Sequence, residues 1–226
     1  SFRKAAKFFD VQTWTGDGTT GRQISHNLAG EVGTLIIKKT SATGAWIVYH
    51  RSLGTSKYMA LESTSQALNF SAVNTVTSTY FVSDNQNASG ATYVAYIFAH
   101  NDGDGEFGPD ADQDIIKCGG YTGTGVANDL LETLDFEPQW MLVKRTDAAS
   151  DWIIVDNMRG AVAGGDVYNI YANQSNAEVE VGSVAPDAVG IRSGNTAAWG
   201  ESNASSGTYI YMAIRRGPLA PPEAAT

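Results

Sequence analysis

The residues of this chain that could perform chemistry are three histidines, one cysteine and a run of aspartates. His26, His50 and His100 are the natural candidates for general acid–base catalysis, because an imidazole titrates near neutral pH. Their spacing matches no zinc-ligand pair, and no Ser–His–Asp or Cys–His set can be assembled from it. Cys118 lies in an apolar, strand-like stretch, which favours a small core residue over a nucleophile. We therefore expect no catalytic residues and no enzymatic activity.

The aspartates are concentrated in one acidic, glycine-rich segment. Carboxylates on a flexible loop are the ligands that a hard cation such as calcium prefers. The candidate metal ligands are Asp102, Asp104, Asp110, Asp112 and Asp114. The segment matches part of the EF-hand pattern, but it lacks the bidentate glutamate at the end of that loop, and Pro109 interrupts it. The sequence therefore favours a solvated acidic linker without metal, and no cofactor is expected.

A glycine-rich segment near the start of the chain resembles a nucleotide site by letter only. Gly16, Gly18 and Gly21 have the spacing of the dinucleotide-binding fingerprint. That motif requires a helix to begin at its last glycine, whereas the residues Arg22–Ser25 are typical of a strand. The segment is better interpreted as a tight hairpin turn.

Comparison of the chain with itself shows a duplication. Residues 34–50 return without a gap as residues 140–156, and Asn87–Val94 returns as Asn203–Ile210. A period of roughly one hundred residues is the size of a small domain and is too long for a solenoid repeat. The expected organisation is a first half with a short basic arm, an acidic linker, a second half and a Pro/Ala-rich tail. Their bounds are 1–100, 101–114, 115–217 and 218–226.

Strand patterns dominate both halves. In the first half the expected strands are 11–15, 22–25, 34–40, 45–50, 57–61, 67–70, 79–83 and 92–100. In the second half they are 115–121, 140–146, 151–156, 189–192 and 208–215. Leu35–Ile37 and Met141–Val143 are apolar on consecutive residues, which is typical of strands covered on both faces. Residues 63–67 and 174–178 could each form one helical turn. The expected fold class is all-β, with two tandem duplicated β-sandwich domains.

Aromatic residues occupy equivalent positions in the two halves. Trp46 and Trp152 each follow a turn beside an apolar strand, so both are expected to be buried core anchors. Two tyrosines lie on the last strand of each half, where alternate side chains face opposite ways. Some of these rings should therefore lie outward and serve an interface, with core packing as the alternative. The binding or interface candidates are Tyr93, Tyr96, Tyr209 and Tyr211.

Composition excludes several classes of protein. The net charge of -9 argues against a nucleic-acid partner, which normally requires a basic surface. No apolar run approaches the roughly 18 residues of a membrane span, so no membrane insertion is expected. A single cysteine cannot form an intrachain disulfide, and no secretion-signal pattern is present. Folding in a reducing cytoplasm fits these observations.

Several motifs spread over nearly the whole chain carry a resemblance. They are Ser1–Ala5, Phe8–Val11, Trp14–Gly18, Ser25–Leu28, Asn87–His100, Asp156–Gly160 and Ile210–Pro218. In combination the chain resembles a family of uncharacterised tandem β-domains in structural proteins of tailed bacteriophages, many of them from marine hosts. The resemblance offers no catalytic residues to carry over.

The resemblance implies a virion protein that is synthesised in the host bacterial cytoplasm. It implies a tail-fibre or related appendage protein that acts in assembly and host-surface adhesion. The implied partners are other virion proteins, a host-surface glycan and the chain itself as a homo-oligomer, with a trimer by analogy with phage fibres. A head fibre or decoration protein is an alternative. A carbohydrate-binding module that stacks sugars on exposed Trp or Tyr rings is another, and a glycan-cleaving enzyme is disfavoured because no paired acids have identifiable roles.

Overall fold

The computed structural model describes residues 4–108, 110–161, 167–195 and 201–217, and its strands pair antiparallel throughout these residues. In the first half, a five-stranded sheet has the order β1-β8-β3-β4-β5 and a three-stranded sheet has the order β2-β7-β6. The strands are β1 (Phe9–Thr15), β2 (Gln23–Ser25), β3 (Glu31–Lys39), β4 (Trp46–His50), β5 (Met59–Ala60), β6 (Thr75–Val76), β7 (Tyr80–Val82) and β8 (Thr92–His100).

The second half repeats this plan with a six-stranded sheet, β14-β13-β12-β11-β17-β9, and a three-stranded sheet, β10-β16-β15. The strands are β9 (Ile116–Thr122), β10 (Leu130–Thr133), β11 (Pro138–Arg145), β12 (Trp152–Asp156), β13 (Val167–Tyr171), β14 (Val179–Val181), β15 (Val184–Asp187), β16 (Gly190–Ser193) and β17 (Thr208–Arg215). The short 3-10 helices are η1 (Arg51–Leu53), η2 (Asp84–Gln86) and η3 (Asn157–Arg159). No helix among the described residues has the length and apolar character needed to cross a membrane.

Strand pairing is equivalent in the two halves. Lys38 lies opposite Trp46 in the β3–β4 hairpin, and Lys144 lies opposite Trp152 in the β11–β12 hairpin. The last strand of each half lies between the first strand and the hairpin, as β8 does between β1 and β3 and β17 does between β9 and β11. The expected all-β fold of two duplicated sandwiches is confirmed.

Local details of the expected secondary structure need correction. The single helical turns expected at 63–67 and 174–178 are wrong, because neither segment is helical. The short helices η1 and η3 instead follow β4 and β12, where His50 and Asp156 each accept a hydrogen bond from a backbone N–H of the helix. Strands β6, β10, β13, β14 and β15 have no counterpart among the expected strands, because they are short and their local pattern does not distinguish them from loops. The strand expected at 67–70 is wrong, because that segment forms only an isolated bridge at Leu68.

The consecutive apolar residues of the central strands are covered on both faces, as expected. Met141 and Val143 belong to the core between the two sheets of the second half. Leu142 lies between them on the opposite face and belongs to an apolar cluster that includes residues of the first half. Continuous apolar strands therefore indicate here that a large sheet packs against a second large sheet.

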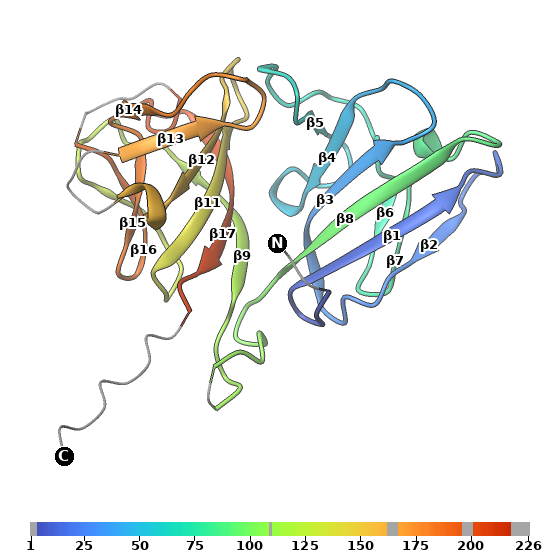
Figure 1. Cartoon of the computed structure of the whole chain (residues 1–226), viewed down its shortest axis with the longest axis horizontal. Coiled ribbons are helices and arrows are strands. Elements are labelled where there is room, and N and C mark those ends of the chain that lie inside the picture. Colours follow the sequence, from blue (N-terminus) through green and yellow to red (C-terminus); the bar gives the residue numbers. More distant parts are fainter. Residues whose placement is uncertain (1–3, 109, 162–166, 196–200, 218–226) are drawn as a thin grey trace.

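The two large sheets face each other across the centre of the molecule, with the small sheets outside (Figure 1). The second half contributes seven buried side chains to the shared cluster, namely Ile116, Cys118, Leu142, Trp152, Ile210, Met212 and Ile214. The indole Nε1 of Trp152 donates to the carbonyl oxygen of Ala60 at 3.0 Å. The two halves are thus joined by an apolar interface that also contains hydrogen bonds from one half to the other.

Lys144 illustrates how the interface modifies a repeated feature. In each half this lysine donates to a carbonyl oxygen at the end of its hairpin loop, Lys38 to Gly44 at 2.6 Å and Lys144 to Ser150 at 2.7 Å. Lys144 is fully buried and also donates to Thr64 of the first half at 3.1 Å. Burial lowers the pKa of Lys144 to about 8, because the ammonium has lost its water.

The equivalent tryptophans differ in burial, which corrects the expectation that both are core anchors. Trp152 is 2% exposed and lies in the cluster shared by the two halves, whereas Trp46 is only partly buried. Trp152→Ala should lower the free energy of unfolding by about 3–5 kcal/mol, since it leaves a cavity. Trp46→Ala should lower it by about 1–2 kcal/mol, since part of that ring is already in water. Chemical denaturation measures both, and equal losses would contradict the assignment.

Candidate functional site

An apolar groove lies on the outer face of the five-stranded sheet. It has a volume of about 430 Å³. We call it the aromatic groove, and its lining residues are Phe9, Val11, Ile36, Trp46, Leu61, Tyr96 and Phe98. Residues two apart on a strand share a face. Phe9 and Val11 on β1 therefore lie on the same face, as do Tyr96 and Phe98 on β8. The groove therefore follows directly from strand alternation and register.

Ring packing fixes the shape of the aromatic groove. Phe9 lies directly opposite Phe98 in the β1–β8 pair, and their ring centroids are 4.8 Å apart. The rings of Trp46 and Tyr96 are stacked at 6.3 Å with an angle of 22° between their planes. The backbone of Trp46 is held on both sides, because its carbonyl oxygen accepts from Leu61 N at 3.0 Å and β4 pairs with β3. The groove is therefore a preformed surface.

Chemically the aromatic groove can bury and stack, but it cannot transfer protons. Its lining residues carry no carboxylate, imidazole, amine or thiol. The polar atoms that the lining side chains offer are the hydroxyl of Tyr96 and the indole nitrogen of Trp46. The Nζ atom of Lys38 lies 5.8 Å from the Trp46 ring centroid at the edge of the groove. This arrangement suits an apolar or ring-bearing ligand.

The corresponding face of the second half is closed. Its residues at the positions of the groove are Ile116, Cys118, Leu142, Trp152, Met212 and Ile214, and all of them are buried in the cluster shared with the first half. The duplication gave each half an equivalent outer sheet face, and the chain itself covers that face in the second half. In the first half Phe9, Ile36 and Phe98 are buried as well, but Val11, Trp46, Leu61 and Tyr96 stay partly exposed.

The tyrosine candidates separate into one groove residue and three core residues. Tyr96 lines the aromatic groove. Tyr93 and Tyr209 are each 2% exposed, and their hydroxyls accept from Ala88 N at 3.2 Å and Ala204 N at 2.8 Å. The expectation that such rings form an interface is thus wrong for Tyr93 and Tyr209.

Tyr211 is also a core residue. It is buried in the second half, and its hydroxyl donates to Glu132 Oε1 at 3.4 Å. Burial raises the pKa of Tyr211 far above its usual value. It therefore faces away from any open surface, and Tyr96 is the interface candidate that the structure retains.

Removing single tyrosine hydroxyls on the last strand of each half tests which of these rings are core residues. Tyr93→Phe and Tyr209→Phe should each lower the free energy of unfolding by about 1–2 kcal/mol, because a backbone N–H loses its acceptor. Tyr96→Phe is the matched control, since its hydroxyl has no partner among the described residues, and it should stay within about 0.5 kcal/mol of wild type. Urea denaturation compares the three. A loss for Tyr96→Phe as large as the others would refute the distinction.

The repeated Asn-Ala-Ser segment is a structural feature that the sequence did not explain. Asn87 Nδ2 donates to Asp17 Oδ1 at 2.8 Å, and Asn203 Oδ1 accepts from Thr124 N at 2.9 Å. Each asparagine thus holds the glycine-rich turn that follows the first strand of its half. A Cβ on Gly16 would lie 2.1 Å from the oxygen of Ala88, so glycine is required there by close approach. This packing accounts for the spacing that resembles a nucleotide fingerprint.

The histidines and the cysteine have structural partners. His26 lies within the first half, where its Nε2 is 3.2 Å from Thr77 O, whereas His50 and His100 lie at the interface between the halves. Burial lowers the pKa of all three imidazoles. Burial also raises the pKa of the Cys118 thiol to about 12, which makes it a poor nucleophile. These residues are not brought together as a catalytic group in the described structure.

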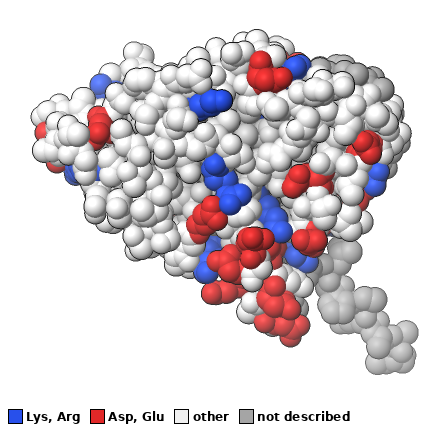
Figure 2. Space-filling view, turned by 180° about the vertical axis from the view of Figure 1, so that it is seen from behind, with Lys and Arg blue, Asp and Glu red and all other residues white. Residues whose placement is uncertain are grey.

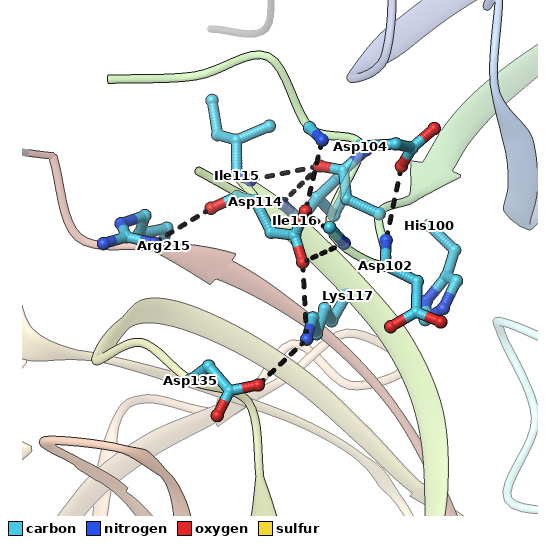
Figure 3. A network of polar contacts seen from close by, with 12 residues as sticks. His100, Asp102, Asp104, Asp114, Ile115, Ile116, Lys117, Asp135 and Arg215 are labelled. Atoms are coloured by element: carbon cyan, nitrogen blue, oxygen red, sulfur yellow. Dashed lines mark hydrogen bonds and ion pairs between the residues drawn. The ribbon is translucent and has the colours of Figure 1, made fainter. Parts of the chain in front are cut away.

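The acidic linker forms a charged cluster at one end of the molecule (Figure 2). Figure 3 shows how its carboxylates are used. Both oxygens of Asp114 lie 3.0 Å from Gly103 N, and one is 3.4 Å from Lys117 Nζ. Asp104 pairs with Lys7 at 2.7 Å, and Asn101 Oδ1 accepts from the N–H groups of residues 115 and 116. The network clamps the two ends of the linker together.

Metal ligands are not assembled in the part of the linker that the structure describes. Asp102, Asp110 and Asp112 are exposed, and no group of three or more His, Cys, Asp or Glu that could hold a metal ion occurs among the described residues. Whether the linker binds a cation in solution stays a prediction. Pro109 lies outside the described residues.

We predict that calcium does not stabilise the fold. A ligand that binds only the folded state raises stability by mass action, whereas Asp114 and Asp104 already have cationic and backbone partners. The melting temperature should be the same in millimolar calcium and in chelator. Differential scanning calorimetry measures this, with magnesium as a control for ionic strength. A calcium-specific increase that chelator reverses would show that the linker is a metal site.

Comparison with known families gives one match. A family described as Domain of unknown function (DUF7483) matches residues 4–218, and the chain therefore belongs to that family. The match includes both halves and the interface between them, so the duplication lies inside the family's own domain. No curated protein and no solved structure matches the chain.

Proposed function

We propose that this chain is a structural protein of a bacteriophage virion, a component of a tail fibre or related appendage, that assembles with itself through the aromatic groove. The sequence motifs that resemble tandem β-domains of phage structural proteins support the virion assignment. The open groove supports the self-association, and it is the observation on which this part of the proposal rests. Partly exposed aromatic rings that lie together are enriched at protein interfaces, where they can be buried by a partner.

The occupant that we assign to the groove is a second molecule of this chain. The argument is continuity with the interface inside the chain. Trp152 and Leu142 lie at the groove positions of the second half, and a sheet face of this same protein covers them. Trp46 and Ile36 form the same kind of surface and border on that interface. A further copy offers the same apolar β-sheet chemistry to them.

Assembly in a closed symmetric oligomer is the commoner solution for such contacts, and the analogy with phage fibres suggests a trimer. In this role the chain is synthesised in the host cytoplasm and functions in the virion. Other virion proteins are its further partners. The charge of -9 makes a nucleic-acid partner unfavourable.

A carbohydrate-binding function is the second candidate, and one observation favours it. The partly exposed rings of Trp46 and Tyr96 lie side by side at an angle of 22°, an arrangement that can stack against a sugar of the host surface. Sugars also require several hydrogen-bonding groups, and the groove lining offers few. The lining therefore favours a protein surface over a glycan.

Self-association can be tested with one groove variant and one matched control. Mass photometry and sedimentation should show that the wild-type chain is an oligomer at micromolar concentration. Trp46→Ser should weaken association at least tenfold, because it removes an aromatic group from the interface centre. Met158→Ala is the control, since Met158 is 91% exposed and lies outside the groove, and it should associate as wild type does. Circular dichroism confirms that both variants fold.

The groove assignment and the virion assignment can be refuted separately. A wild-type chain that is monomeric at micromolar concentration, or a Trp46→Ser variant that associates normally, refutes the groove assignment. Binding on a glycan array that Trp46→Ser abolishes would favour the carbohydrate-binding module. Electron microscopy of purified particles with an antibody against the chain tests the virion assignment, and absence of label from the particles would contradict it.

A further inference from the structure

Two of the three histidines lie where the halves meet, and both use Nδ1 as a hydrogen-bond acceptor. His50 is buried at the end of β4, and its Nδ1 accepts from Ser52 N at 3.2 Å. Because Nδ1 accepts, the ring proton is on Nε2, which lies 3.0 Å from the carbonyl oxygen of Tyr211 in the second half. In the neutral ring both nitrogens therefore make hydrogen bonds, and the bond of Nε2 connects the two halves.

His100 makes the complementary contact at the neighbouring strand. Its Nδ1 accepts from the backbone N–H of Cys118 on β9 at 3.2 Å. The thiol of Cys118 is buried against the first half, with Sγ 3.4 Å from Thr34 Oγ1 and 3.6 Å from Ala99 O. The two imidazoles thus connect the first half to β17 and to β9, the strands that lie at one side of the apolar interface.

The charged surroundings do not favour an imidazolium. Arg51 is the nearest cation, its Nη1 lies 3.5 Å from Cys118 O, and its charge lowers the pKa of both histidines. No carboxylate is hydrogen-bonded to either ring among the described residues. The other titratable groups that act on this region are Glu31, Asp102, Lys117, Glu132 and the Tyr211 hydroxyl, of which Glu31 and Asp102 raise the pKa of the less buried His100.

The second half shows which residue occupies the position of His50 when no carbonyl oxygen of another half has to be bound there. The counterpart of His50 is Asp156, which accepts from Arg159 N in the same capping role. A carboxylate can cap the short helix but cannot also donate to a carbonyl oxygen. Histidine at position 50 satisfies both requirements, at the cost of a group that titrates in mildly acidic solution.

We propose that His50 and His100 form an acid-sensitive latch between the two halves of the chain. Protonation places a hydrogen on each Nδ1, which can then no longer accept from its backbone N–H. His100 loses its bond to Cys118 N of the second half. His50 loses its bond to Ser52 N, and displacement of its ring also breaks the Nε2 bond to Tyr211 O of the second half. The imidazolium must leave its site, and the interface opens along β9 and β17. Opening exposes Leu142, Trp152 and Met212, the face of the second half that corresponds to the aromatic groove. The latch does not depend on the proposed virion function.

The pH range follows from the linkage between protonation and opening. Burial lowers the pKa of His50 to about 4 in the closed state, against an ordinary value of 6.5. A base whose pKa is depressed on closing gives full stability above pH 6.5 and loses it as the pH falls toward 4. At pH 5 the equilibrium for opening should be roughly 30-fold more favourable than at pH 7.5 through His50 alone, since each pKa unit is a factor of ten.

Cys118 is the only cysteine of the chain and reports on the latch directly. We would measure its labelling by 4,4′-dithiodipyridine, a reagent that reacts with thiols in acid, at pH 7.5 and pH 5. Rates are divided by those of the urea-unfolded chain at the same pH. The normalised rate should rise roughly 30-fold at pH 5. Amides of β2 and β7, which lie away from the interface, should stay protected from hydrogen exchange while amides of β9 lose protection.

Matched variants separate the latch from general acid sensitivity. His50→Asn combined with His100→Asn retains acceptors near the backbone N–H groups but does not titrate, so the increase in labelling at pH 5 should disappear. His26→Asn is the control, because His26 also accepts a backbone N–H through Nδ1, from Leu28 at 3.4 Å, but within the first half. It should leave the pH response of Cys118 unchanged.

Wild-type measurements alone can overturn the latch. It is refuted if Cys118 labelling is no faster at pH 5, if NMR titration shows ordinary pKa values near 6.5 for His50 and His100, or if β2 and β9 lose protection together. It is also refuted if the double variant keeps the full acid response.

Discussion

Both large sheets are apolar on their two faces, and the rest of the structure depends on how those faces are covered. Burying apolar surface is the dominant favourable term in folding, so a face left in water destabilises the chain. Each small three-stranded sheet covers only the inner face of its large sheet. The outer face of the second half is covered by the first half, and part of the outer face of the first half is left over. The central interface and the aromatic groove are two outcomes of the same constraint.

The polar features of the interface follow from that apolar packing. A buried donor or acceptor needs a partner, and for several groups at this interface the partner comes from the other half. Trp152, Lys144 and His50 each bond to a backbone carbonyl across the boundary. Such bonds add little net free energy, but they are costly to leave unmade, so they fix how the halves fit together. In the latch that we propose, the acid sensitivity lies instead on the Nδ1 atoms of His50 and His100, which accept from backbone N–H groups.

Duplication gave this chain two equivalent sheet faces, of which one is buried and the other is partly exposed. We connect this difference in burial with function. The second half uses its surface internally, through Trp152. The first half keeps Trp46 and Tyr96 partly exposed on a rigid sheet. The acidic linker lies at one end of the molecule, and Asp114 and Asn101 hold its two ends together. Membership of a family without an assigned function leaves the groove as the main guide to partners.

The duplication, the all-β class and the strands with the strongest pattern could be predicted from the residues alone, because they depend on local alternation and on turn residues. The same patterns indicated that Leu35–Ile37 and Met141–Val143 are covered on both faces. Which copy of each repeated residue is buried could not be predicted in this way. Trp46 and Trp152 have nearly the same neighbours in sequence, and so do Tyr93 and Tyr209, yet the tyrosines are both core and the tryptophans differ. The physical reason is that burial on an outer sheet face is set by residues distant in the chain, and no local pattern records which face finds a partner.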